Sequence, residues 1–446
     1  MDGVQESGRA VKEIILSKTQ GSAPAGDRSA NIEKAVLLFL AISAFYGLAM
    51  GLSDSVMANY FKEAYRVDAQ QRGFIEFPRE LPGVVSIIAI AAVAPFGMIK
   101  GARVTIMLFF AGILTLALIR PGFSSMLAIL FVFSLGMHMF IPFNDSIGIS
   151  LAVKGSAGKM LGRFRSMTMA FIMVAGLIVF FGFRSGLFSF ETPVTVFILS
   201  AAAALTVIIL FTAMKKVMPA EIQFVNTSES RSFIQNVKRN FVFRKQYARY
   251  YVICALFGGR KQIMFVYSPW VLIELLGFKA DSISILAIIG SLIGIFFMPV
   301  VGRLIDRHGT RKVMIAEALA FIMIYVAYGL LSRWVNAQGG TVVLVGIAML
   351  LVYLLNIIDR MSAQFAMVRA LYMQSIAINK EDVTPSLTVG MAIDHVVAIV
   401  GSLVCGTVWY VWGPEYVFVI AGVMSLLNLI VASGIRPQPR PEREAA

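Results

Sequence analysis

Charged side chains interrupt several of the most apolar segments of this 446-residue chain. Arg260 and Lys261 follow two glycines in ICALFGGRKQIMFVYSPWV, and Asp394 and His395 lie together in GMAIDHVVA. A planar guanidinium can grip a carboxylate or phosphate through two parallel hydrogen bonds, and histidine changes its charge near neutral pH. These residue types therefore favour anion binding and proton transfer.

A further acidic group occurs in IEFPRELPG, where Glu76, Arg79 and Glu80 have the i, i+3, i+4 spacing that places side chains on one helical face. Asp54, in GLSDSVM, adds another acid. One interpretation is a proton or cation site in which Arg79 tunes the affinity of the acids. The other is a hydrated helix start.

Two more polar pairs lie in apolar surroundings, Asn144 with Asp145 in FIPFNDSIG and Asp359 with Arg360 in NIIDRMS. Adjacent helical residues point about 100° apart, so Asp359 and Arg360 are expected to have different partners. Each pair can be functional or can be a structural contact between helices, and the sequence leaves both interpretations open.

The depth of Arg260 within its apolar segment also leaves two alternatives. A helix rises about 1.5 Å per residue, which places Arg260 near the middle of a hydrocarbon core about 30 Å thick. It therefore needs an internal acid, for which Asp394, Asp359 and Asp54 are candidates, or an anionic substrate. Tyr267, two turns later, is predicted to share its face.

The neighbours of Arg260 in sequence give two further expectations. Lys261 points in another direction and is expected to pair internally. The glycines before it, at 258 and 259, permit either a helix break or close packing.

The composition indicates an integral membrane protein, because 58% of residues are hydrophobic, 14% are charged and the mean hydropathy is +0.79. The net charge of +14 comes from short basic clusters between apolar runs, which we interpret as topology signals and not as a nucleic-acid surface. Cys254 and Cys405 are the only cysteines, lie in apolar segments and are expected to be inert.

Twelve segments have the length of about 20 apolar residues that crosses a bilayer. They are 35–58, 73–96, 103–119, 126–150, 165–184, 193–213, 249–272, 281–301, 313–332, 341–362, 385–410 and 415–434. They define six-helix bundles at 35–213 and 249–434, a central loop at 214–248, and tails at 1–34 and 435–446. The lysines and arginines favour the side that holds both tails and this loop, which predicts cytosolic termini.

The two halves resemble each other, since PVTVFILSAAAAL at 193–205 aligns with PEYVFVIAGVMSL at 414–426 without a gap. The segment GRLIDRHGTRKVM also resembles the cytoplasmic-loop signature of the major facilitator superfamily. The matching residues are Gly302, Asp306, Arg307, Gly309, Arg311 and Lys312. The equivalent loop of the first half, FGMIKGARVTIM, lacks the aspartate.

The resemblance implies an all-α integral membrane fold of twelve transmembrane helices in two pseudo-symmetric six-helix bundles. It implies that Asp306 faces Arg163 and Arg165 and helps to close the cytosolic side. Spans three, six, nine and twelve would be peripheral supports, and of these only span nine carries an internal charge, Glu317 near its cytosolic start. The other charged spans would line a central cavity.

The resemblance implies transport by alternating access. The charged residues, which include both signs of charge, several acids and a histidine, favour proton-coupled transport of a small polar, anionic organic solute. The substrate-binding candidates are Arg260, Tyr267, Lys261, Arg79, Arg360 and Asn144. The proton-coupling candidates are Asp54, Glu76, Glu80, Asp145, Asp359, Asp394 and His395.

Two other functions stay open, an exporter of a metabolite or amphipathic compound and a non-transporting sensor with the same fold. The scattered histidines and the lack of a nucleophile–base motif argue against metal transport and enzymatic activity. We expect a monomer in the cell membrane that uses no metal, cofactor or nucleic acid.

Overall fold

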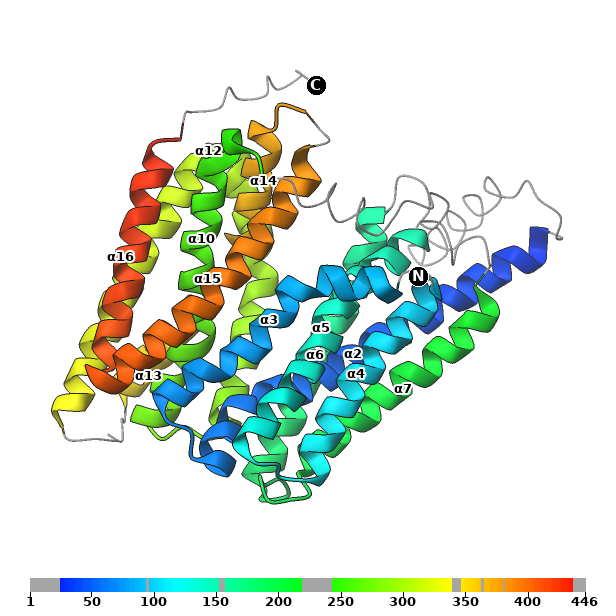
Figure 1. The fold of residues 1–446 in the computed structure, drawn as a ribbon, viewed down its shortest axis with the longest axis horizontal. Helices are drawn as coiled ribbons and strands as arrows, with labels where there is room; N and C mark the ends of the chain where they lie inside the picture. The colour runs from blue at the N-terminus through cyan, green and yellow to red at the C-terminus, as the bar shows by residue number, and fades with distance from the viewer. Residues whose placement is uncertain are drawn as a thin grey trace. The chain divides into compact units, whose positions relative to one another are not determined.

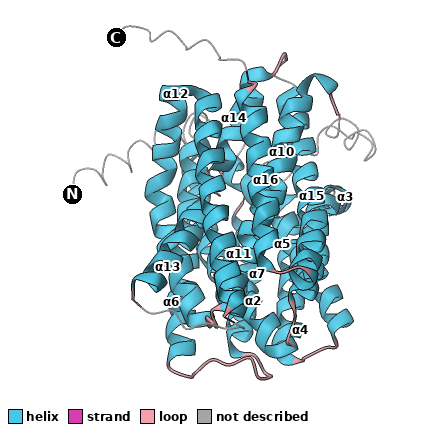
Figure 2. Cartoon of the chain, turned by 90° about the vertical axis from the view of Figure 1, so that its left-hand side faces the viewer, coloured by secondary structure: helices cyan, strands magenta, loops and turns pink. Residues whose placement is uncertain are grey.

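The computed structural model describes residues 25–93, 96–151, 157–218, 243–338, 346–361, 365–379 and 382–435. Every regular element in these ranges is helical (Figure 2). Nine of the helices described are long and apolar enough to cross a membrane. Three other predicted spans are less regular or more polar: α3 (Ala69–Val93) contains several charges, the segment from 248 to 275 changes helix type, and α13 (Ile347–Met361) is short.

The chain divides into two compact units. The first comprises Met1–Ser53, Val85–Ile178 and Thr192–Arg231, and the second comprises Asp54–Val84, Val179–Glu191 and Ser232–Ala446. Helices α2 (Ala25–Tyr65) and α3 therefore contribute residues to both units. The predicted division into bundles at 35–213 and 249–434 stays a prediction.

The first unit contains α4 (Met98–Leu118), α5 (Phe123–Ser150), α7 (Thr195–Val217) and most of α6 (Ala157–Arg184). Helix α4 packs against both α5 and α7 (Figure 1). The Ser200 hydroxyl donates a 2.7 Å hydrogen bond from α7 to the carbonyl of Ala49 in α2. Close packing and such small polar contacts hold helices together where lipid removes the hydrophobic driving force.

The second unit is built from the remaining helices (Figure 1). They are α10 (Ala248–Gln262), η3 (Ile263–Tyr267), α11 (Ser268–Trp270), η4 (Val271–Leu275), α12 (Ala280–Ala337), α13, α14 (Ala366–Ile376), α15 (Val383–Val411) and α16 (Pro414–Ser433). Helix α10 packs on α15, and α12 packs on α16. Elements η3 and η4 are π-helical, a rare geometry that often marks functional sites.

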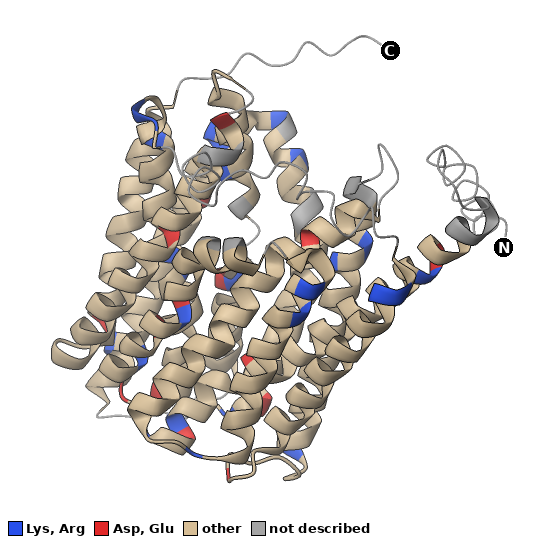
Figure 3. Cartoon of the chain, turned by 45° about the vertical axis from the view of Figure 1, so that its right-hand side comes forward, with Lys and Arg blue, Asp and Glu red and all other residues tan. Residues whose placement is uncertain are grey.

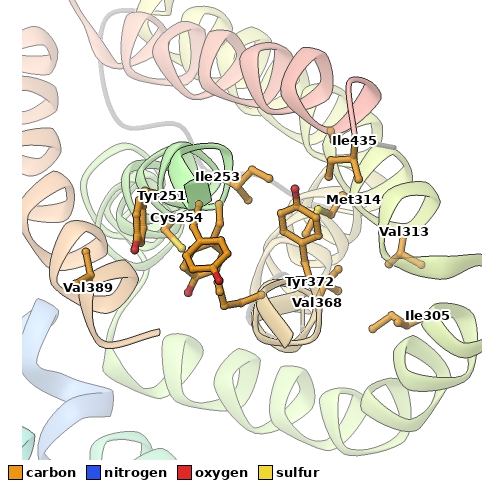
Figure 4. Packing of buried hydrophobic residues seen from close by; sticks show 14 of the residues in the cluster. Tyr251, Ile253, Cys254, Ile305, Val313, Met314, Val368, Tyr372, Val389 and Ile435 are labelled. Atoms are coloured by element: carbon orange, nitrogen blue, oxygen red, sulfur yellow. The ribbon is translucent and has the colours of Figure 1, made fainter. Parts of the chain in front are cut away.

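A buried cluster fixes the start of α10 against the neighbouring helices (Figure 4). Tyr251 and Cys254 from α10 belong to it together with Met314 from α12 and Val368 and Tyr372 from α14. Cys254 and Cys405 are both buried free thiols. This packing holds the backbone of α14 where Arg369 emerges.

The amino-terminal helix is longer than predicted. Helix α2 begins at Ala25, whereas the first predicted span begins at residue 35. Polar residues extend this helix because helix formation needs only backbone hydrogen bonds once a long apolar segment has nucleated it. Residues 1–24, most of the predicted central loop (219–242) and the end of the carboxyl-terminal tail (436–446) lie outside the described residues.

The signature loop is a helix break at Gly309. This residue has φ 79° and ψ 161° and separates the two helices that make up α12. Gly97, in the equivalent loop of the first half, has nearly the same conformation, φ 82° and ψ 164°, immediately before α4. The two loops thus share a turn that only glycine adopts without strain.

We expect Gly309→Ala to destabilise the protein by about 1–3 kcal/mol, because a side chain in this region of φ and ψ is strained. The measurement is the midpoint of thermal unfolding of the purified protein. Gly302→Ala is the matched control, since Gly302 lies within the helix and an added Cβ would have nothing within 4 Å. Equal midpoints for the two variants would contradict the prediction.

Candidate functional site

Buried ionisable side chains of the second unit form the candidate site. Charged residues occur along the length of helices as well as at their ends (Figure 3). Because an ionised group in hydrocarbon is costly, each of these charges needs a partner or a ligand.

One buried group, which we call the arginine triad, consists of Arg260, Glu317 and Arg369. Arg260 of α10 forms an ion pair and hydrogen bond with Oε1 of Glu317 in α12. Nη1 of Arg369, in α14, lies 3.8 Å from the same oxygen. The three residues are only 3%, 1% and 7% exposed, respectively. Two guanidinium groups thus share one carboxylate, which leaves one positive charge in excess.

The surroundings of the arginine triad are aromatic. The guanidinium carbon of Arg260 lies 4.0 Å from the ring centre of Phe321, and that of Arg369 lies 3.1 Å from the ring centre of Phe257. Nη1 of Arg260 and Nη2 of Arg369 are buried and have no hydrogen-bond partner among the described residues. Cation–π contact stabilises the charge but does not satisfy these donors.

The partner of Arg260 corrects the sequence prediction. Asp394, Asp359 and Asp54 were the candidates, and Glu317 takes this place instead. Its position near the start of a predicted support helix concealed this contact. The sequence signal was present, however, since Glu317 is the single charge in the interior of that span.

Lys261 pairs with Asp394, as the expectation of an internal partner required. Its Nζ lies 2.5 Å from Oδ2 of Asp394 in α15. The two helices approach closely here, because a Cβ on Gly258 would lie 2.6 Å from Oδ1 of Asp394. Helix α10 continues without a break through Gly259, so of the two roles predicted for the glycines the structure has close packing.

His395 and Asp394 are adjacent but have different partners. Nδ1 of His395 lies 2.7 Å from Oε2 of Glu80 in α3. The two residues make separate contacts, since neighbouring residues on a helix diverge by about 100°, and their role in proton coupling stays a prediction. Both contacts are partly buried, with side-chain exposures between 12% and 19%.

Glu76 is the centre of a second cluster. It accepts hydrogen bonds from Arg72, from Nη1 of Arg79 at 2.9 Å, and from the amide of Gln262 at 2.9 Å. Nη2 of Arg79 also lies 3.2 Å from Asp54, which is 59% exposed. Arg79 does contact two of the acids, as predicted, while Glu80 turns to His395.

Sequence reasoning did not identify Arg72 or Gln262. Arg72 precedes Glu76 by four residues on α3, a spacing that brings side chains together. It was overlooked because the second span was predicted to begin at residue 73. Gln262 follows Lys261 directly and has no signal in the sequence beyond that position.

Asp359 of α13 is fully buried. Its Oδ2 accepts a hydrogen bond from the hydroxyl of Ser268, and the Tyr325 hydroxyl lies 3.5 Å from Oδ1. No ion pair of Asp359 is present in the described part of the chain. Arg360 donates instead to Asn356, 3.1 Å away, so the expectation of different partners is confirmed. A buried carboxylate whose hydrogen-bond partners are hydroxyl groups is suited to holding a proton.

Tyr267 lies in a different environment from Arg260. It is fully buried, and its hydroxyl donates to the backbone carbonyl of Ser402 in α15. Arg260 contacts Glu317 and Phe321 of α12 instead. The predicted shared face assumed α-helical spacing throughout, and the π-helix η3 changes that spacing between the two residues.

Four of the predicted site residues, Asn144, Asp145, Arg163 and Arg165, lie in the first unit. Asp145 lies 3.0 Å from Nη2 of Arg165, whose side chain is exposed. Asn144 is half-buried and Arg163 is exposed. Asp145 therefore has a partner within its own unit.

Comparison with known proteins identifies the family. The family model described as Major Facilitator Superfamily matches residues 37–377. The chain belongs to the major facilitator superfamily. No curated protein has a significant sequence match to this chain.

Solved transporters of the superfamily have the same fold. The nucleoside transporter NupG is similar with a TM-score of 0.69 and 14% identity, over 90% of this chain and 98% of that one. A D-xylose–proton symporter is similar with a TM-score of 0.66 and 15% identity, over 91% of this chain and 98% of that one. The peptide transporter POT in complex with sulfate is similar with a TM-score of 0.65 and 14% identity, over 90% of this chain and 93% of that one. The fold class is therefore confirmed as that of an all-α, multi-pass membrane transporter.

The superfamily signature lies at the break in α12. Arg311 donates a 2.9 Å hydrogen bond to the Ser433 carbonyl at the end of α16, where a positive charge is favoured by the helix dipole. Arg307 and Lys312 are exposed. The side chain of Asp306 lies outside what the structure describes, so its contact with Arg163 and Arg165 stays a prediction.

Proposed function

We propose that this transporter moves a small anionic organic solute by alternating access, in symport with protons. The observation that carries the proposal is the arginine triad, in which two buried guanidinium groups share one carboxylate and keep two unpaired donors. Arginine binds carboxylates bidentately, and a low-dielectric site strengthens such a contact. A substrate carboxylate or phosphate would supply both the missing charge and the missing acceptors.

Proton coupling is supported by two further features of the same unit. The contact between His395 and Glu80 joins an imidazole to a carboxylate, and a proton can pass between two such groups. Asp359 is buried with hydroxyl partners and has no described ion pair. Symport with protons also occurs in this fold, since one of the similar structures is a D-xylose–proton symporter.

The proposal includes a topology and a cycle. Both termini lie in the cytosol, the protein is a monomer of the cell membrane, and bundles at 35–213 and 249–434 move against each other. Arg260 binds the substrate, and Lys261, Arg79 and Arg360 of the same unit contribute further polar groups. Glu76 and Asp54 tune Arg79, and the signature loop with Asp306 closes the cytosolic side.

The test is uptake by proteoliposomes of a panel of labelled solutes: monocarboxylates, dicarboxylates, organic phosphates, a nucleoside and a sugar. We expect accumulation of at least one anion when the inside is alkaline, and loss of accumulation when an ionophore collapses the pH gradient. An alkaline interior drives uptake because the proton moves inward down its gradient and the symported solute moves with it. Gradient-driven uptake of neutral members alone would contradict the proposed substrate class.

Export of an amphipathic compound is the second candidate. An apolar pocket of about 410 Å³ lies among Gly259, Ile263, Val397, Gly401 and Met424 in the second unit. Its lining offers no charged or amide group, so it suits a hydrocarbon and not an anion. Accumulation of amphipathic dyes when the inside is acidic would favour this function, because an antiported proton then drives the dye inward.

A further inference from the structure

We propose that Glu317 is the proton-carrying counter-ion of an anion site formed by Arg260 and Arg369. Glu317 then occupies the site as an internal substitute for the transported anion and leaves it when protonated. This inference rests on the proposed function, since it assumes that the transported solute is an anion. It assigns a coupling proton to Glu317, in addition to the groups proposed above.

The geometry places Glu317 between the two arginines. Its Oε1 contacts Nη2 of Arg260 and Nη1 of Arg369, so a single oxygen serves both guanidinium groups. The other terminal nitrogens, Nη1 of Arg260 and Nη2 of Arg369, have no described partner. One carboxylate oxygen is therefore too few acceptors for this pair of arginines. An incoming carboxylate or phosphate, with two or more oxygens, can satisfy both.

The charge balance fixes the coupling between proton and anion. The triad carries one positive charge in excess when Glu317 is ionised. When Glu317 takes a proton from water, its carboxylate becomes a neutral acid and the excess rises to two. A bound monoanion returns the excess to one. Because changes in buried charge are costly, one proton and one monoanion bind together more readily than either alone.

The other ionisable groups around the triad have partners of their own. From α15, Asp394 is held by Lys261 at 2.5 Å, and from α13, Asp359 is held by Ser268. Cys254 and Tyr250 of α10 and Asp394 also interact electrostatically with Arg369. Tyr325 of α12 and Asp359 interact electrostatically with Arg260. Among the described residues, Glu317 is the acid that forms ion pairs with both arginines.

The experiment measures stabilisation of the purified full-length protein by acetate, benzoate and inorganic phosphate, at about pH 5 and about pH 8. A ligand that binds only the folded state raises the unfolding midpoint according to its concentration relative to Kd. For the native chain we expect binding of at least one probe to be about tenfold tighter at the acidic pH, equivalent to about 1.4 kcal/mol.

The decisive variant is Glu317→Gln, which imitates the protonated acid. We expect it to bind the same probe at both pH values with the affinity of the native protein at acidic pH, and to lose the pH dependence. Asp382→Asn is the matched control, because Asp382 is also buried and lies 2.9 Å from an arginine, Arg244. It should keep the native pH profile. The double variant Glu317→Gln with Arg260→Gln should lose probe binding.

The outcomes separate this inference from the proposed function. If Glu317→Gln binds a probe with the native pH dependence, the proton is carried elsewhere and the inference is overturned, while anion transport stands. If no probe binds the native chain or Glu317→Gln at either pH, the anion site itself is refuted. Should Glu317→Gln unfold on purification, Glu317→Asp takes its place, since it keeps the charge and shortens the side chain. A pH profile of probe binding that differs from the native profile supports the inference, and an unchanged profile overturns it.

Discussion

Replacing Arg260 with glutamine should lower uptake of the transported anion by about 100-fold or more. Two hydrogen bonds to a charged substrate contribute about 1.5–3 kcal/mol each, and each 1.4 kcal/mol corresponds to a factor of ten. Glutamine also leaves Glu317 with Arg369 as its single counter-charge, so the excess positive charge of the triad disappears. The measurement is initial uptake by proteoliposomes under an inside-alkaline gradient.

Two variants give this prediction its controls. Arg249 lies on the same helix as Arg260, but its side chain is exposed and donates to the carbonyl of Gly434. Uptake by Arg249→Gln should therefore stay within a factor of about two of native uptake. Arg260→Lys keeps the charge and loses the planar fork, and an intermediate activity is expected. Native uptake by Arg260→Gln, in folded protein, would rule out a role for Arg260 in binding.

The second large effect is expected for Asp359→Asn. This substitution removes a protonatable group but keeps the size of the side chain and its contacts with Ser268 and Tyr325. If Asp359 carries a proton during the cycle, concentrative uptake should fall by about tenfold or more, while exchange of labelled for unlabelled solute continues. Exchange does not need the empty carrier to return, so it does not need proton release.

The matched control is Asp281→Asn, an acid in the first turn of α12 that contacts Ser282. It should leave both concentrative uptake and exchange unchanged within about twofold. A parallel loss of uptake and exchange in Asp359→Asn would instead indicate a structural role. A parallel retention of both would assign proton coupling to other groups, such as His395 with Glu80 or Glu317.

The fold could be predicted in large part. Hydrophobic spans, the internal repeat and the signature loop all follow from local sequence, because a bilayer forces each crossing segment to be long, apolar and helical. The break at Gly309 was predictable from the residue type, because glycine permits a backbone bend that other residues adopt only with strain. The early start of α2 was not, because polar residues carry no membrane signal.

The candidate site could be predicted only in part. The sequence identified Arg260, Lys261, Asp359 and Asp394 as intramembrane charges, because a charged residue within an apolar run is visible without any partner. It also predicted that Lys261 pairs internally and that Asp359 and Arg360 diverge, which the structure confirms. Arg369 was missed because it lies beyond the predicted end of its span. Glu317 stood out in the sequence as the single charge within its span, but nothing in the sequence indicated Arg260 as its partner.

The sequence by itself determined that this protein is a membrane-spanning carrier with charges inside its spans, because hydropathy and residue type are local properties. The pairing of those charges was decided by the tertiary structure alone. Residues 57 positions apart, Arg260 and Glu317, meet because α10 and α12 both pack on α16, and their long side chains span the remaining distance between the two helices. A π-helical turn after Gln262 likewise moves Tyr267 away from the face that regular spacing predicts. Which charges meet depends on the rotation and depth of each helix against its neighbours, and these are set by packing across the whole unit.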